Sequence, residues 1–453
     1  MADTINMKTV LSHADVSRRQ FIKTSSLLAA GTAVAPYAIT SHAAPDDPIR
    51  VALIGCGSRG MGAVQNVLTA GPNIKLVALG DLFPDRMIAA RAQLEKMGSG
   101  PSQGNTWAPG SVTKSLQGMN LKIADEFCFT GFDAYRKVLA IPEVNYVILA
   151  TPPHFRSIHL KAVIEAGKHA FVEKPVAVDP TGVRSVLASG ELAKQKGLGI
   201  LAGTQRRHQA NYVETMKRIH DGALGTLTSA RAYWNQGTMW MKDRKPEWSD
   251  LEWQLRNWMY FTWLSGDHIV EQHLHNIDVI NWAMKEHPIS ALGLGGRQVR
   301  TGPEYGNIYD HFAVEFEYKS GLRLQSFSRQ MDNCSNAIGE VVVGTKGSST
   351  VNVGVIKGEN AWRYAGKAGN PYDDEHVDFV NSIRAGQPLN EAQAIAESNL
   401  TAIMGREATY SGQLVDWDSA MESKLDLSPK AYAFGPMAVP PVAMPGQYKF
   451  IVD

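Results

Sequence analysis

Short apolar runs alternate with amphipathic stretches through the first half of the chain. Residues 51–54 and 74–79 have the length and branched-chain content of buried strands, and residues 145–150, 169–172 and 199–202 repeat the pattern. Helical spacing of apolar positions fills the intervals between these runs. Strands and helices that alternate up to about residue 205 predict a doubly wound parallel sheet of the Rossmann type, an α/β fold.

Beyond residue 205 the pattern changes to alternating apolar and polar positions. Five such runs are separated by glycine-containing turns and predict an open, mostly antiparallel sheet in an α+β domain: residues 226–234, 291–300, 311–318, 322–329 and 338–343. One helix is expected over residues 266–284 and another over 391–405.

These patterns divide the chain into four expected parts: an N-terminal segment at 1–43, an α/β domain at 44–205, an α+β domain at 206–410, and a tail at 411–453. The tail is rich in Pro, Ala and Gly from residue 425. We expect it to wrap the surface or to cross to a neighbouring subunit.

The first 43 residues differ in texture from the rest. Arg18 and Arg19 precede a moderately apolar stretch at 27–38, and Ser41-His42-Ala43 has the small residues of a cleavage site. This order resembles a twin-arginine export signal and predicts a periplasmic protein, with a basic N-terminal arm as the alternative. No other stretch reaches the roughly 20 apolar residues of a membrane span.

Charge and cysteine content argue against several classes of partner. The chain carries 45 Lys and Arg against 44 Asp and Glu, so it offers no electrostatic case for binding nucleic acid or an anionic membrane. Cys56, Cys128 and Cys334 have no paired spacing, and no disulfide framework is expected.

The most specific local signal lies after the first apolar run. Gly55, Gly57 and Gly60 form a G-x-G-x-x-G turn between a strand and a helix, and Asp81 ends the next strand about 20 residues later. A helix N-terminus behind such a turn binds a pyrophosphate, and a terminal acid binds ribose hydroxyls. Because a carboxylate repels a 2′-phosphate, NAD is favoured over NADP. The turn also contains Ser58 and Arg59.

Polar residues also follow the later strands of this domain. In a doubly wound sheet the carboxyl ends of the strands face the ligand. We therefore expect the same nucleotide to contact the residues that follow two of these strands: Thr151, Pro152, His154, Glu173 and Lys174.

Four features of the sequence occur together: the glycine turn, the strand end Ala150-Thr-Pro-Pro-His154, the triplet Glu173-Lys174-Pro175, and a downstream helix with an acid and a histidine. With these features the chain resembles the Gfo/Idh/MocA oxidoreductase family over residues 49–410. That family includes glucose-fructose oxidoreductase, inositol dehydrogenase and NAD-dependent glycosidases. The resemblance implies a lysine, Lys174, beside the reacting carbinol. It also implies that residues 44–205 form the dinucleotide-binding domain, and that residues 206–410 bind the substrate and form the contacts of a dimer or tetramer.

The family's Asp-x-x-x-His step matches Glu271 and His275 here, with Asp278 three residues on. Glu271 stands where Asp is usual, and His273 stands where glycine is common, which puts a second base near the pocket. Oxidising a secondary alcohol requires a base for the hydroxyl proton. We assign His275 as the leading general base, Lys174 as the group that polarises the oxygen, and Glu271 as a helper on the same helix face.

Two alternatives accompany this assignment. A lone helical histidine is usually structural, and His273 lies about 200° from His275 around a helix, so it joins the site only if the helix bends. The acids and histidines of residues 267–275 could also be metal ligands, but their spacing fits no standard metal-binding motif and no metal is expected.

Aromatic residues point to a carbohydrate substrate. Six of the 10 tryptophans lie between residues 234 and 263, a density that suits stacking on sugar C–H surfaces, although core packing is the alternative for each of them. The candidates for substrate contacts are Tyr233, Trp234, Asn235, Arg207, Trp258 and Tyr309.

Outside the inner membrane no pool of free NAD exists, so an exported enzyme must keep and recycle its cofactor. We therefore expect an NAD-dependent oxidoreductase that acts on a secondary hydroxyl of a sugar or glycoside with tightly bound NAD. One alternative is an NAD-dependent glycosidase that works through transient C3 oxidation and elimination. The other is a non-catalytic sugar-binding protein, which would need neither Lys174 nor His275.

Overall fold

The first sheet of the protein lies in the N-terminal half of the chain. The computed structural model describes residues 47–100, 114–367 and 369–450. Six parallel strands pair in the order β3-β2-β1-β4-β5-β6: β1 (Ile49–Ile54), β2 (Ile74–Asp81), β3 (Cys128–Thr130), β4 (Tyr146–Leu149), β5 (His169–Val172) and β6 (Ile200–Ala202). The order reverses at β1, which confirms the doubly wound Rossmann-type sheet.

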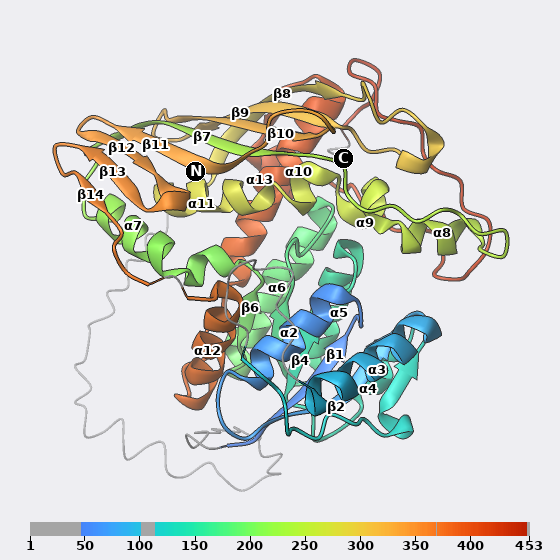
Figure 1. Ribbon diagram of the computed structural model, residues 1–453. Coiled ribbons are helices and arrows are strands. Elements are labelled where there is room, and N and C mark those ends of the chain that lie inside the picture. The colour runs from blue at the N-terminus through green and yellow to red at the C-terminus, as the bar shows by residue number, and fades with distance from the viewer. Residues whose placement is uncertain (1–46, 101–113, 368, 451–453) are drawn as a thin grey trace, which may run out of the picture. The chain divides into compact units, whose positions relative to one another are not determined.

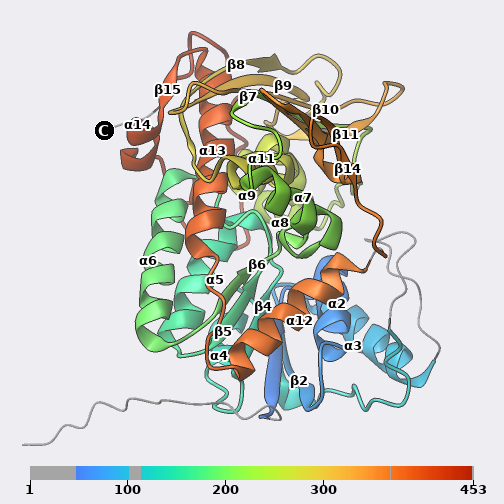
Figure 2. The ribbon, with the colours of Figure 1, turned by 90° about the vertical axis from the view of Figure 1, so that its left-hand side faces the viewer.

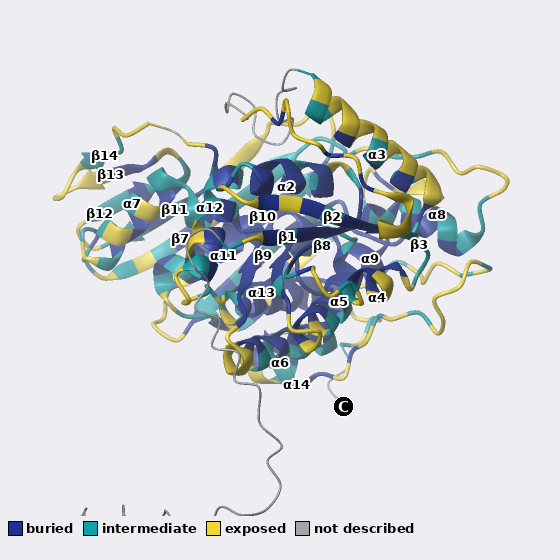
Figure 3. Ribbon diagram, turned by 90° about the horizontal axis from the view of Figure 1, so that it is seen from below, coloured by how far each residue is buried: buried dark blue, intermediate teal, exposed yellow. Residues whose placement is uncertain are grey.

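Helices connect these strands, and apolar side chains seal them to the sheet (Figure 1). They are α2 (Ser58–Leu68), α3 (Pro84–Ser99), α4 (Ala134–Leu139), α5 (Pro153–Glu165) and α6 (Pro180–Lys196), with a 3₁₀ turn η1 (Asp125–Phe127) before β3. Figure 3 shows α2 as buried and α3 with exposed positions along one side. α2 is buried so deeply because a much later helix, α12 (Pro371–Arg384), covers it (Figure 2). Phe379, Val380 and Ile383 of α12 share an apolar cluster with Val51 and Leu53 of β1.

The second sheet has nine strands in the order β14-β13-β12-β11-β7-β10-β9-β8-β15. Only β7 and β10 pair in parallel, so the expected open and mostly antiparallel sheet is confirmed. The strands are β7 (Leu227–Gln236), β8 (Pro288–Gly296), β9 (His311–Tyr318), β10 (Arg323–Gln330), β11 (Ala337–Gly344), β12 (Gly347–Thr350), β13 (Val355–Gly358), β14 (Trp362–Arg363) and β15 (Val415–Asp416).

One face of this sheet is covered by helices. α11 (Leu274–Met284) packs against β7 and β11, and α13 (Ala392–Ser411) packs against β8 and β9 (Figure 1). A Cβ on Gly293 would lie 2.1 Å from the Thr409 hydroxyl of α13, so this residue faces the helix. The alternate residues Leu292 and Leu294 therefore face the opposite side of the sheet.

The remaining short elements surround these layers. They are α7 (Ala210–His220), α8 (Asp250–Arg256), α9 (Thr262–Ser265), α10 (His268–Glu271) and α14 (Trp417–Glu422), with 3₁₀ turns η2 (Gln205–His208), η3 (Trp258–Tyr260), η4 (Pro303–Tyr305) and η5 (Val351–Val353).

The single helix expected over residues 266–284 is wrong, because two helices, α10 and α11, occupy this stretch and residues 272–273 separate them. Gly266 has a φ of +78° and ends α9, and Asp267 has a φ of +71° and begins α10. The buried Asp267 carboxylate accepts hydrogen bonds from the Tyr309 backbone N–H at 2.7 Å and from the Tyr410 hydroxyl at 2.5 Å. These tertiary bonds hold the break between α9 and α10, which the local sequence does not encode.

The segment after α14 has neither helix nor strand up to residue 450. It is held instead by hydrogen bonds to distant parts of the chain, such as the one from the Tyr309 hydroxyl to the Ala443 carbonyl at 2.8 Å. The tail therefore packs against distant parts of its own chain, and the expectation that it wraps the surface or crosses to a neighbouring subunit stays a prediction.

Three further expectations concern topology and covalent structure. No helix among the described residues is long and apolar enough to cross a membrane. Cys56, Cys128 and Cys334 are free thiols. The segment that resembles a twin-arginine signal lies outside the described residues, and the expected domain boundaries remain predictions.

Candidate active site

The glycine turn joins β1 to α2 in very close contact with neighbouring backbone. Gly55 has a φ of +98°, and a Cβ there would lie 2.6 Å from the Thr151 nitrogen at the end of β4. A Cβ on Gly60 would lie 2.1 Å from the Gly55 carbonyl oxygen. A Cβ on Gly57, by contrast, would meet no atom within 4 Å. Two glycines are therefore required by packing, and the third keeps the helix end open.

The open end of α2 has the features of a dinucleotide site. Gly57 is the N-cap residue and provides no side-chain capping bond, which leaves the first N–H groups of the helix available to a ligand. Asp81, at the end of β2, accepts hydrogen bonds from the Cys56 N–H at 2.7 Å and the Phe83 N–H at 2.8 Å. Its carboxylate thus lies beside the turn, where it can bind ribose hydroxyls. The residues present fit NAD.

Arg59 and Glu173, both expected to contact the cofactor, bind each other. The Arg59 guanidinium donates to Glu173 at 2.5 Å and to Glu375 of α12 at 3.2 Å, and it lies 4.9 Å from the ring centre of Tyr372. A Cβ on Gly203 would lie 2.6 Å from the Glu173 carboxylate, so a larger residue there would displace this carboxylate from Arg59. This ion pair joins the glycine turn to β5 and to α12, a connection the sequence did not suggest.

Lys174 follows Glu173 and points toward the second sheet. Its ammonium group donates to the Glu271 backbone carbonyl at 2.6 Å and to the Glu271 carboxylate at 3.2 Å. Both side chains are largely buried, with 14% and 9% of their surface exposed. The strand end and α10 thus bring together two of the residues predicted to act in catalysis.

His275 lies on α11 with its ring stacked on Trp234 of β7, with 5.7 Å between ring centres and 19° between planes. Burial, together with the charges of Lys174, Arg206 and Arg59, lowers the pKa of His275 well below its ordinary value. The imidazole is therefore neutral near pH 7. Because α10 ends at Glu271 and α11 begins at Leu274, the continuous helix face expected for residues 271 and 275 is wrong.

His273 belongs to a different environment. Its Nε2 shares a hydrogen bond of 2.7 Å with the Ser326 hydroxyl on β10, and its side chain is fully buried. Burial lowers the pKa of His273 to about 3, with a further contribution from Arg206. The idea of a second base at this position is not supported, because the side chain is bonded to the sheet.

Of the six residues predicted to contact substrate, Trp234 stacks on His275. The other five have partners in other parts of the structure. Tyr233 stacks on Phe327 on the far face of the sheet, and Asn235 lies on that face because side chains alternate along a strand.

The other three are held by the fold. Arg207 donates to Asp278 at 2.8 and 2.9 Å, and Tyr309 is buried with its hydroxyl on Ala443. Trp258 packs edge-on against Trp240, with 6.1 Å between their ring centres.

The strand end after β4 is held by internal bonds. Arg156 donates to the Thr151 carbonyl at 2.7 Å and to the Pro175 carbonyl at 3.0 Å. Pro152 is the N-cap residue of α5. His154 shares a hydrogen bond of 2.8 Å with the hydroxyl of Tyr432 in the tail, and burial lowers its pKa to about 4. His154 thus faces a part of the chain nearly 280 residues away.

A buried network beside Trp234 escaped the sequence analysis. The Glu340 carboxylate accepts from Arg206 and Asn276, both at 2.6 Å, and from the Tyr212 hydroxyl at 3.2 Å. Arg206 lies 5.7 Å from the Trp234 ring centre. Because Arg206 lies in η2, the turn that comes after β6, the rule that ligand-binding residues follow parallel strands could have identified it.

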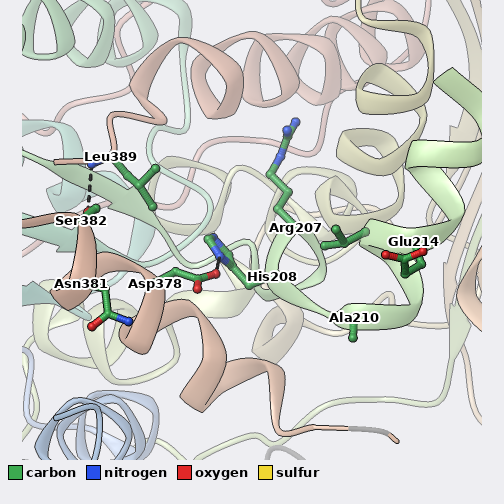
Figure 4. Close-up of a pocket in the computed structure, with 9 residues that line it drawn as sticks. Arg207, His208, Ala210, Glu214, Asp378, Asn381, Ser382 and Leu389 are labelled. Carbon is green, nitrogen blue, oxygen red and sulfur yellow. Dashed lines mark hydrogen bonds and ion pairs between the residues drawn. The ribbon is translucent and has the colours of Figure 1, made fainter. Parts of the chain in front are cut away.

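A pocket of about 650 Å³ has nine lining residues: Arg207, His208, Ala210, Val213, Glu214, Asp378, Asn381, Ser382 and Leu389 (Figure 4). His208 Nδ1 lies 2.7 Å from the Asp378 carboxylate, and Arg207 is directed away from that pair toward Asp278. Neither Lys174 nor His275 lines this pocket. In the part of the chain that the structure describes, no cluster of three or more His, Cys, Asp or Glu side chains could hold a metal ion.

Two family models match the chain. Residues 100–203 match the oxidoreductase family with the NAD-binding Rossmann fold, GFO/IDH/MocA, and residues 212–350 match the GFO/IDH/MocA C-terminal domain.

Two curated relatives share about a quarter of their residues with this chain over the regions that align. A glycosyl hydrolase family 109 protein of Streptomyces coelicolor is 28% identical over 181 residues, which is 40% of this chain and only 33% of that protein. Inositol 2-dehydrogenase 3 of Saccharopolyspora erythraea is 25% identical over 291 residues, 61% of this chain and 78% of that protein.

A solved structure, aldose-aldose oxidoreductase from Caulobacter crescentus, has a TM-score of 0.61 at 17% identity. The match covers 82% of this chain and 100% of that chain. At this level of identity the similarity shows a shared fold.

Proposed function

This chain belongs to the Gfo/Idh/MocA oxidoreductase family, and from that membership we propose that it oxidises a secondary hydroxyl of a sugar or glycoside with NAD that stays bound between turnovers. The NADH formed would be reoxidised in the same site by passing its hydride to the carbonyl carbon of a second sugar. The observation that carries the proposal is the contact of Lys174 with Glu271 at the carboxyl end of the NAD-binding sheet. The charge of Lys174 also helps burial to lower the pKa of His275. Non-catalytic binding would require neither an ammonium group nor a neutral imidazole at this place.

The chain supplies a separate group for each part of the cofactor. The N-terminus of α2 behind Gly57 would bind the pyrophosphate, and Asp81 would bind the adenosine ribose. Bound NAD supplies a hydride acceptor. The remaining task of the protein is to orient the sugar and to move one proton.

Lys174 is suited to bind the reacting oxygen. An ammonium group has three N–H donors, and two of them go to the carbonyl and carboxylate of Glu271. The third is available to a substrate hydroxyl. Glu271 holds the amine in place, and we assign it as a positioning residue.

His275 is suited to accept the hydroxyl proton. Because burial lowers the pKa of His275, its imidazole is neutral near pH 7, and a ring nitrogen has a lone pair that can accept the proton. The stacking of its ring on Trp234 fixes the plane of the imidazole. We therefore assign Trp234 as a positioning residue for His275.

A second candidate function is hydrolysis of a glycoside with no net redox change, through transient oxidation at C3. The similarity to a glycosyl hydrolase family 109 protein favours it, although that similarity spans a third of the relative's length. The scheme needs an additional base to remove the C2 proton. Glu271 is the carboxylate in place beside Lys174, since His273 is bonded to Ser326.

Two further proposals concern the protein in its cell. We propose that residues 1–43 direct export to the periplasm by the twin-arginine route, which a fusion of this segment to a reporter tests. We also propose a homodimer or homotetramer that forms through the far face of the nine-stranded sheet, where Leu292 and Leu294 are 52% and 77% exposed. Light scattering of the Leu294→Lys variant, expected to be a smaller species, tests the second proposal.

An aryl glycoside in D₂O separates the candidate functions. Accumulation of a stable keto sugar supports net oxidation. Free phenol together with deuterium at C2 of the sugar supports redox-assisted hydrolysis and overturns net oxidation. If sugars bind but neither product appears, both enzymatic proposals are wrong. The Glu271→Gln variant tests the C2 base, because it should lose both deuterium incorporation and phenol release if Glu271 removes the C2 proton.

A further inference from the structure

The tail beyond α14 reaches back to the first sheet. Its Phe434 ring stacks on Phe83, with 6.0 Å between ring centres and 18° between planes, and lies 5.3 Å from the Phe132 ring centre. Tyr432 lies 6.2 Å from the same Phe132 ring and shares its hydroxyl with His154. Tail residues thus contact the segments that follow β2, β3 and β4.

These three segments surround the place where the adenosine half of NAD belongs. Phe83 follows Asp81 by two residues, and its N–H donates to the Asp81 carboxylate that would bind the ribose. Phe132 follows Gly131, whose N–H donates to the Asp81 carbonyl at 3.1 Å. The aromatic rings that meet the tail are therefore direct neighbours of the ribose-binding acid.

The tail is held at both ends of this crossing by bonds to stable elements. The Leu427 N–H donates to the Asp179 carboxylate at 2.9 Å, before the crossing. After it, the Leu251 N–H of α8 donates to the Gly435 carbonyl at 3.2 Å, and Gln254 donates to the Met437 carbonyl at 2.9 Å. Figure 1 shows the red tail running past α8. Between these anchors the tail has no helix or strand, and such segments open at low free-energy cost.

The two aromatic side chains retain accessible surface in this position. Tyr432 is 37% exposed and Phe434 is 49% exposed, although both already contact other rings. Large half-exposed aromatic side chains beside a nucleotide site gain burial when a ligand fills that site.

We propose that Tyr432 and Phe434 are nucleotide-site residues, and that the tail forms an outer wall over the adenosine half of NAD and slows its release. This inference rests on the proposed function, since it accounts for how one NAD molecule is kept through successive turnovers. Opening of the tail between its anchors would be the step that permits exchange.

The test measures release of radiolabelled NAD from the full chain during a chase with unlabelled NAD. In Phe434→Ala the dissociation rate constant is expected to rise about three- to tenfold, as expected for loss of one aromatic contact. Tyr432→Phe, which removes only the hydroxyl shared with His154, is expected to raise it about threefold. Tyr448→Phe is the matched control, because its hydroxyl donates to Glu407 at 2.7 Å, far along the tail.

NAD release is measured without sugar, so the test of the tail is independent of the proposed reaction. Faster release in both variants, with the Tyr448→Phe rate equal to that of the unaltered protein, supports the wall. Equal release from all four proteins overturns it, whatever the outcome of turnover assays. Rapid release from the unaltered protein would refute cofactor retention in the proposed function, while the ratio between variants would still decide the role of the tail.

Discussion

The glycine turn permits a matched pair of substitutions that separates packing from binding. Gly57→Ala adds a methyl group with no atom within 4 Å, at a residue whose φ of −77° suits alanine. Gly60→Ala adds the same methyl group 2.1 Å from the Gly55 carbonyl oxygen and 3.0 Å from the Leu53 side chain. Backbone cannot rotate away as a side chain can, so α2 must move from β1.

Gly60→Ala is expected to change the free energy of unfolding, and Gly57→Ala the free energy of NAD binding. Overpacking at Gly60 costs about 1–3 kcal/mol, and the severity of the contact places it at the upper end. Helix propensity returns up to about 1 kcal/mol, so the free energy of unfolding should fall by about 2 kcal/mol. At Gly57 stability should stay within about 0.5 kcal/mol, but the methyl group keeps phosphate oxygens from the helix N–H groups. Loss of one charged hydrogen bond, about 1.5–3 kcal/mol, weakens NAD binding roughly ten- to 100-fold.

Urea unfolding without nucleotide measures the first quantity, and calorimetric titration with NAD measures the second. Gly57→Ala should unfold like the unaltered protein and bind NAD poorly, whereas Gly60→Ala should unfold at lower urea. If Gly57→Ala binds NAD normally, the pyrophosphate does not approach this helix end. If Gly60→Ala is as stable as Gly57→Ala, the close packing of α2 on β1 is not a constraint.

Three other predictions concern chemistry, packing and pH. Lys174→Ala should abolish turnover while calorimetry still detects NAD binding; near-normal turnover would exclude Lys174 from the mechanism. Glu340→Ala should lower the free energy of unfolding by about 3–5 kcal/mol in urea titrations, because it leaves the buried Arg206 unpaired, and a loss below about 1 kcal/mol would contradict this. Acid should also destabilise the fold, since burial lowers the pKa of several histidines to about 3 or 4: His154, His159, His169 and His273. Their folded-state pKa values lie below the unfolded value near 6.5, so the unfolded state binds more protons and each histidine costs up to about 1.4 kcal/mol per pH unit below 6.5. Burial raises the pKa of Asp267 to about 6, so this carboxyl group favours the folded state in acid and offsets part of the destabilisation by the histidines. Equal melting temperatures at pH 7 and pH 5 would refute the predicted net loss of stability in acid.

The sequence alone determined the first sheet and its glycine turn, because these features depend on local spacing. Apolar runs of strand length, separated by helical patterns, predicted five of the six parallel strands, and the short strand β3 was missed. The open sheet followed from alternation in the same way. Lys174 and Asp81 were identifiable because both follow strands, and parallel strands bring their carboxyl ends to one edge.

Only the tertiary structure decided which side chains meet. Trp234 and Tyr233 are adjacent in sequence, yet they point to opposite faces of β7, and the helices cover only one of these faces. The break at Asp267 exists because its carboxylate is bonded to Tyr309 and Tyr410, which lie more than 40 and 140 residues away. The contact of Phe434 with Phe83 depends equally on distant anchors. Local sequence sets periodicity, but the partners of buried polar and aromatic groups are set by chain segments that only folding brings together.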